Sequence, residues 1–202
     1  IRWVLWSVAS ALDCAHNHGW AHNDVKTLNV CCQPVVDSKA AEIYRRADVK
    51  PQRVRLVDWG AATALDWRDD RTRGTQGYNA PENTDLTQGC TSAHDTWMLG
   101  CLLLEIVTHG AFDCNHPSEV LETWLPNAIT HCQQNGQLPL ANLLQRLLEE
   151  RPELRLGAGQ GLVTELLEHS YFSGLSPTQW ALECALRTQL CDSTSRHIQC
   201  ER

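Results

Sequence analysis

The sequence predicts an α+β fold that is mainly helical and has a few short β-strands. Apolar residues recur at helical spacing over residues 1–16, which is the pattern of an amphipathic helix. Residues 94–107 are apolar on nearly all sides, which indicates a helix buried inside a domain. Between them, residues 54–57 alternate in polarity, as is typical of a strand. With 202 residues, the chain is long enough to bury a hydrophobic core.

The remaining elements are predicted from shorter signals. Gly19 is the natural C-terminal cap of the first helix, because glycine tolerates the left-handed backbone found there. A compact polar loop follows, and residues 30–32 form a short strand candidate. Further helices are expected near residues 117–133, 138–149, 160–169 and 177–190.

The composition excludes several classes of protein. The net charge is −7 and the chain has no large basic block, which argues against a nucleic-acid partner. No apolar run reaches the roughly 18 residues that a membrane span needs, so no membrane partner is expected either. The chain starts at Ile1 without Met or a signal peptide, and we interpret this start as a cut rather than a natural terminus.

The ten cysteines include no C-x-x-C pair, so they lack the spacing of zinc ligands. Several lie within apolar periodic segments, where a free cysteine behaves as a small hydrophobic residue. We interpret them as buried thiols of a protein in a reducing compartment, cytoplasmic or nuclear.

One polar constellation carries chemistry. Asp24, Lys26 and Asn29 lie on one tight loop, and Asp58 directly follows a predicted strand. Phosphoryl transfer needs a carboxylate that orients a hydroxyl, a lysine near the moving charge and oxygen ligands for magnesium. A single loop aspartate is more often a turn former or a helix cap. The hypothesis of phosphoryl transfer therefore depends on the combination of these residues and not on any one of them.

These residues sit in motifs that resemble the eukaryotic protein kinase family, specifically its larger C-terminal lobe. Residues 22–29 read HNDVKTLN and are similar to the catalytic loop H-R-D-x-K-x-x-N. Asp58-Trp59-Gly60 resembles the metal-binding D-F-G element. Residues 74–82 resemble the end of an activation segment, and residues 95–100 resemble a D-x-W-x-x-G helix start. Residues 155–157, followed by residues 166–172, resemble the last conserved block.

The resemblance covers residues 1–173 and defines the expected organisation of the chain. These residues would form the C-terminal lobe of a protein-kinase-like fold, with a polar insert at about 33–52. Residues 174–202 would form a C-terminal tail. No glycine-rich phosphate loop or strand lysine of the small lobe is found in the sequence, so we expect the N-terminal β lobe to be absent from this chain. That lobe, or another partner, would pack on the exposed face.

The resemblance implies ATP-dependent phosphoryl transfer to serine or threonine of a protein substrate. Asp24, Lys26 and Thr75 are the implied catalytic residues. Asn29 and Asp58 would hold the Mg²⁺ ions that bridge the phosphates of ATP, and Cys31 would lie at the nucleotide site.

The resemblance also implies structural roles. Asp95 would accept hydrogen bonds from backbone amides of the catalytic loop. Glu82 and Arg155 would form a buried ion pair. His22 and Trp59 would stack as core residues, and Gly60 completes the metal-binding element.

Three departures from the family pattern matter for function. Asn23 replaces the usual arginine and removes the strongest anchor for a phosphorylated activation segment. Trp59 replaces phenylalanine but keeps an aromatic plug. Leu28 stands where arginine-directed kinases often carry glutamate, which weakens a preference for basic substrates. Glu105 could still meet a basic substrate residue.

Two alternatives to an active protein kinase remain open at this point. The start at Ile1 and the changed Asn23 fit a pseudokinase or a truncated lobe that acts as a binding scaffold. A small-molecule phosphotransferase of the aminoglycoside-kinase type shares the pattern H-x-D-x-x-x-x-N. The run at residues 74–82 argues against the second alternative, because that segment builds a platform for a peptide. Without the small lobe, the isolated chain is expected to show little or no turnover.

Overall fold

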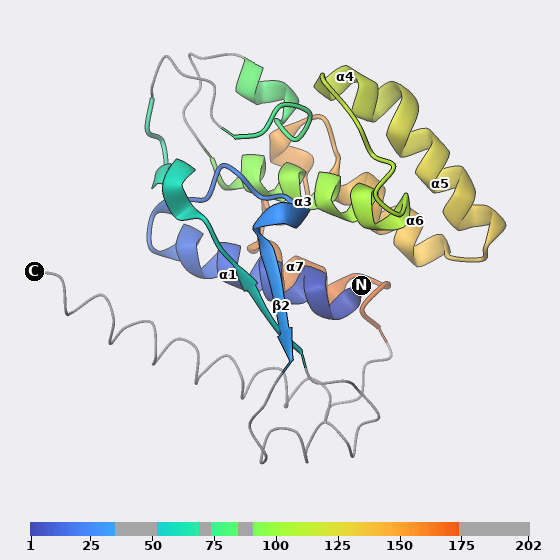
Figure 1. The fold of residues 1–202 in the computed structure, drawn as a ribbon, viewed down its shortest axis with the longest axis horizontal. Helices are drawn as coiled ribbons and strands as arrows, with labels where there is room; N and C mark the ends of the chain where they lie inside the picture. The colour runs from blue at the N-terminus through green and yellow to red at the C-terminus, as the bar shows by residue number, and fades with distance from the viewer. Residues whose placement is uncertain (35–51, 69–73, 85–90, 174–202) are drawn as a thin grey trace, which may run out of the picture.

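The computed structural model describes residues 1–34, 52–68, 74–84 and 91–173. The described residues form helices packed around one buried helix (Figure 1) and two small antiparallel sheets, so the predicted α+β class is confirmed. Most of the predicted insert, the C-terminal tail and the helix expected near 177–190 lie outside the described residues.

Helix α1, Arg2–Asn17, agrees with the predicted amphipathic helix. Its apolar stripe includes Leu5, Val8 and Leu12, which are fully buried. This face packs against α3, α7 and β3. The helix ends where Gly19 takes a φ of +79° and donates its N–H to the His16 carbonyl, as expected for a glycine after a helix end.

Helix α3, Ser92–Val107, is the centre of the core, as its apolar sequence predicts. Every residue from 94 to 104 is buried. A side chain at Gly100 would lie 2.7 Å from the Leu148 side chain, so this glycine allows α3 to approach the end of α6, Leu138–Leu147. Because this helix is buried on all sides, its polar residues are held in fixed positions.

The remaining helices follow α3 in the sequence. Helix α4, Pro117–Glu119, continues through the π-helical turn η4, Val120–Trp124, into α5, Leu125–Gln134. Helix α5 packs against α6, and α7, Leu162–Glu168, packs against α1. The helices predicted near 117–133, 138–149 and 160–169 are therefore confirmed to within a few residues.

The two sheets carry the functional loops. Strand β2, Val30–Pro34, pairs with β3, Gln52–Leu56. Strand β1, Trp20–Ala21, pairs with β4, Thr63–Ala64; both are too short for an alternating pattern, and the sequence showed neither. Among the described helices, none combines the length and hydropathy needed to cross a membrane.

Candidate active site

The predicted catalytic side chains meet around the carboxylate of Asp24. Lys26 donates from Nζ to Asp24 Oδ2 at 2.8 Å and to Thr75 Oγ1 at 2.7 Å. The Thr75 hydroxyl in turn donates to Asp24 Oδ1 at 2.6 Å. Asn29 donates from Nδ2 to Asp24 Oδ2 at 3.0 Å and to the Asp24 carbonyl at 2.8 Å. Thr75 comes from a segment 51 residues away in sequence, so the fold assembles this cluster.

The network fixes the protonation of Asp24. Partial burial by itself would raise the pKa of Asp24, but hydrogen bonds from Lys26 and Thr75 outweigh burial and lower the pKa below its usual value. The carboxylate is therefore ionised at neutral pH. Such a group accepts and orients hydrogen-bond donors, and it is a weak proton acceptor.

Asp95 on α3 holds the catalytic loop from beneath. Its carboxylate accepts the backbone N–H of His22 and of Asn23, each at 2.8 Å, and the Nε2 of His16 lies 2.8 Å from Oδ2. Asp95 is fully buried; burial would raise its pKa, but the hydrogen bond and the charge of His16, the nearby His94 and the backbone N–H of His22 together lower it. The two backbone contacts are those that the family resemblance implies. His16 is a third partner that the motif spacing did not reveal.

Asn23 has a structural role at the position where the family usually has arginine. Its backbone is left-handed, with φ of +65°, a conformation that asparagine tolerates better than most residues. Its side-chain amide donates to the Ala61 carbonyl at 3.1 Å and to Thr63 Oγ1 at 2.8 Å. These bonds tie the catalytic loop to the chain that follows the Asp58-Trp59-Gly60 motif.

The rings of His22 and Trp59 are in contact but are not stacked, and the two residues differ in burial. Their rings meet edge to face with centroids 4.6 Å apart. His22 is fully buried, whereas Trp59 is 41% exposed. The expectation that both are core residues is therefore wrong for Trp59, since much of its indole remains at the surface of the described structure.

A backbone hydrogen bond of the preceding residue, Val57, brings Asp58 close to Asn29. The Val57 N–H donates to the Asn29 carbonyl at 2.9 Å, next to the β2–β3 pair. Asp58 has a φ of +60°, and its Oδ1 accepts the N–H of Gly60 at 3.3 Å. No described contact joins its carboxylate to Asp24 or Asn29. Cys31, on β2 opposite Arg55, is exposed.

The donor set suits magnesium. Asn29 uses its amide nitrogen for Asp24, and no described residue donates to its Oδ1. Asp58 offers an exposed carboxylate. Mg²⁺ prefers a few such oxygens together with water and substrate phosphates over a complete protein cage. The described residues include no cluster of three or more His, Cys, Asp or Glu that could hold a metal ion.

Glu82 and Arg155 form a bidentate ion pair at 2.6 and 3.0 Å. The Arg155 side chain is fully buried. Its other donors go to the carbonyls of Ala93, Glu149 and Glu150. All five N–H groups of the guanidinium are thereby used, and the pair ties the end of the 74–82 segment to the helices below it.

Sequence reasoning missed a second link between the functional segments. Thr27 donates to Glu105 Oε2 at 2.6 Å, and the Tyr78 hydroxyl donates to the same oxygen. Both hydroxyls already occupy Glu105 Oε2, so the expectation that Glu105 could meet a basic substrate residue is wrong for this oxygen. Burial and the neighbouring Glu105 carboxylate raise the pKa of Tyr78, so the phenol stays protonated.

The structure thus brings together the residue types that phosphoryl transfer needs: an ionised aspartate, a lysine and an asparagine, with a second aspartate close by in the fold. The comparison with known families agrees. The protein kinase domain model matches residues 1–172, and the chain belongs to the protein kinase family.

Three curated relatives that the chain resembles are longer than the chain itself. The serine/threonine-protein kinase PKZ1 of Phytophthora infestans strain T30-4 is 30% identical over 85% of the chain, which covers 44% of that protein. The ribosomal protein S6 kinase-like 1 of Mus musculus is 36% identical over 52% of the chain and 18% of that protein. The cGMP-dependent protein kinase of Eimeria tenella is 27% identical over 85% of the chain and 16% of that protein. The chain thus spans less than half the length of these relatives.

Proposed function

We propose that this chain is the C-terminal lobe of a serine/threonine protein kinase, which transfers the γ-phosphoryl group of ATP to a hydroxyl of a protein substrate. The observation that carries the proposal is the closed network of Asp24, Lys26, Asn29 and Thr75. It joins the catalytic loop to the 74–82 segment, on which a peptide would lie.

The network leaves one position on Asp24 for the acceptor hydroxyl. A carboxylate has about four lone-pair sites. Lys26 and Asn29 occupy Oδ2, and Thr75 occupies one site on Oδ1. A serine or threonine of the substrate would donate to the remaining site on Oδ1. Because the pKa of Asp24 is lowered, its main effect is to aim the hydroxyl at the γ-phosphorus.

Lys26 supplies positive charge at the same place. Its Nζ already lies within 2.8 Å of Asp24, so the ammonium is fixed before substrate arrives. A preorganised cation stabilises the charge that develops on the transferring phosphoryl oxygens. Asn29 and Asp58 would hold Mg²⁺, which when bound neutralises phosphate charge.

The serine/threonine class is supported by Gly74-Thr75 ahead of Ala80-Pro81-Glu82 and by relatives named as serine/threonine kinases. The alternative is a scaffold without catalysis, which Asn23 at the arginine position favours. We also propose that the 202-residue chain alone has little turnover, because its sequence has no glycine-rich phosphate loop to complete an ATP site.

We further propose that the protein works in a reducing compartment, cytoplasmic or nuclear. The described cysteines are free thiols, which supports this proposal.

A matched pair of aspartates tests the proposal. Asp58 and Asp66 both have φ near +60°, so replacement by asparagine strains neither backbone. The full-length natural protein that contains this chain, given labelled ATP and Mg²⁺, should phosphorylate a mixed serine/threonine peptide library. Asp58→Asn should lower this rate at least about 100-fold, and Asp66→Asn should leave it unchanged. No transfer by the unsubstituted protein would favour the scaffold.

A further inference from the structure

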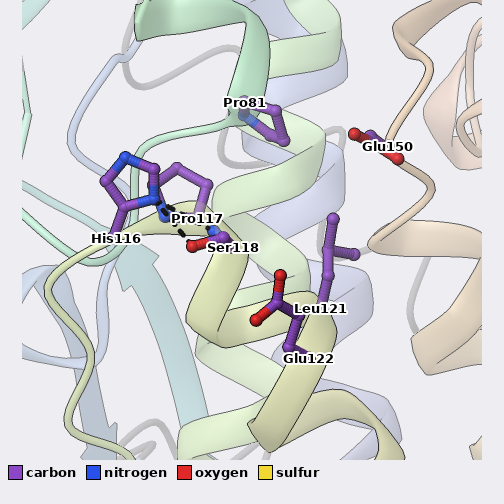
Figure 2. A pocket seen from close by; sticks show the side chains of 7 residues that line it. All are labelled: Pro81, His116, Pro117, Ser118, Leu121, Glu122 and Glu150. Atoms are coloured by element: carbon purple, nitrogen blue, oxygen red, sulfur yellow. Dashed lines mark hydrogen bonds between the residues drawn. The ribbon is translucent and has the colours of Figure 1, made fainter.

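A pocket of about 370 Å³ lies beside the end of the 74–82 segment, outside the site described above. We call it the α4 pocket because α4 and η4 form one wall (Figure 2). The residues used below are Pro81, His116, Pro117, Leu121, Glu122 and Glu150.

The α4 pocket combines an apolar floor with an acidic rim. Pro117 is buried, and Pro81 and Leu121 are half-buried. Glu122 and Glu150 are exposed and reach the pocket from different elements, as Figure 2 shows. Neither carboxylate forms an ion pair within the described part of the chain. The rim therefore has negative charge available to a ligand.

One buried guanidinium holds two parts of the pocket lining that lie outside α4 and η4, at Pro81 and at Glu150. Arg155 pairs with Glu82, the residue after Pro81, and donates to the backbone carbonyl of Glu150 at 3.1 Å. These two parts of the lining are thus held in place relative to each other before any ligand arrives, and a preorganised surface loses less entropy on binding.

We propose that the α4 pocket docks a basic segment of the protein substrate, an arginine or lysine next to an apolar residue, so this inference rests on the proposed function. The aliphatic stem of such a side chain covers apolar surface while its charged end stays at the rim. Glu122 and Glu150 then accept charge-assisted hydrogen bonds. A divalent cation fits less well, because the described residues, His116 included, form no metal-binding cluster. The net charge of −7 favours the same partner.

The test uses the full-length natural protein and a fluorescein-labelled probe peptide, with binding followed by fluorescence anisotropy in the absence of ATP. The probe carries Arg-Leu-Arg between glycine and alanine residues and has no serine, threonine or tyrosine. Glu122→Gln with Glu150→Gln should weaken its binding roughly three- to tenfold. The matched control, Glu153→Gln with Glu168→Gln, makes the same charge change at exposed sites outside the pocket and should leave binding unchanged.

Two outcomes overturn the inference. One is equal binding of a peptide in which glutamates replace both arginines, and the other is equal weakening by the control pair. In kinetics, the Glu122/Glu150 pair should raise KM for a protein substrate that carries such a segment. It should not change kcat or the KM for a short peptide that contains only the acceptor. Because the anisotropy assay needs no catalysis, specific peptide binding without phosphoryl transfer would contradict the proposed function and leave the binding surface standing.

Discussion

At the scale of single residues, Thr75 decides how Asp24 meets its substrate. Its hydroxyl accepts from Lys26 and donates to Asp24, so it holds the two charged groups at fixed separation. Thr75→Val keeps the shape of the side chain but removes this bridge. Hydrogen bonds to charged groups contribute about 1.5–3 kcal/mol, so we expect kcat of the full-length protein to fall about tenfold or more.

Serine provides the matched control for Thr75→Val. Thr75→Ser keeps the hydroxyl and should retain most of kcat, whereas a role in packing alone would make serine the more damaging replacement. Steady-state kinetics at saturating ATP separates the two roles. Equal losses in both variants would contradict the bridging role.

At the scale of elements, the Glu82–Arg155 pair joins the 74–82 segment to the helical base. Removing one partner of a buried pair leaves an uncompensated charge and costs about 3–5 kcal/mol. Arg155→Met should therefore lower the free energy of unfolding by about that amount. Urea denaturation of the chain, followed by circular dichroism, measures the loss.

The control for the buried pair is Arg151, which lies 3.6 Å from Glu149 and whose side chain is 67% exposed. Exposed pairs contribute about 0–1 kcal/mol, so Arg151→Met should have little effect. Combining Glu82→Leu with Arg155→Met should recover part of the loss, because no isolated charge then remains buried. A purely additive double variant would contradict the pairing argument.

Sequence alone predicted the elements whose pattern lies within a short stretch of chain, and it did not predict contacts between residues far apart in the sequence. Helix α3 could be predicted because burial on all sides leaves an apolar run, and the Asp24 loop could be predicted because its residues are close in sequence. Contacts set by tertiary packing gave no such signal. Thr27 and Tyr78 meet on Glu105 only because α3 passes beneath both segments. The exposure of Trp59 likewise depends on what covers its outer face and has no pattern in the sequence.

At the scale of the whole molecule, buried histidines make stability depend on pH. His94 is buried beside Asp95, Glu82 and Arg155, and no described residue is hydrogen-bonded to either of its ring nitrogens. Burial lowers the pKa of His94, and it also lowers the pKa of His22. In the unfolded chain these groups have pKa values near 6.5, so the unfolded state binds protons that the folded state does not.

The sign of the effect follows from proton linkage. Where the unfolded state binds more protons, stability rises with pH. The stabilisation is complete above pH 6.5 and is lost as pH falls from there towards the folded-state pKa. Asp24 and Asp95 also have lowered pKa values, but their unfolded-state values lie near 4, so their contribution is lost at lower pH. The window between pH 5.5 and 7.5 therefore reports mainly on histidines.

His94→Leu should reduce this pH dependence, because leucine fills the buried site without a group that takes up protons on unfolding. We expect the free energy of unfolding of the unsubstituted chain to fall between pH 7.5 and 5.5, and the variant to lose less over the same interval. One proton taken up on unfolding contributes about 1.4 kcal/mol for each pH unit below 6.5, so the two proteins should differ by up to about 1.4 kcal/mol at pH 5.5. Exposed His131 supplies the control, since His131→Leu should leave the slope unchanged. Urea titrations at three pH values measure all three proteins, and identical slopes for the unsubstituted chain and the His94 variant would contradict the linkage.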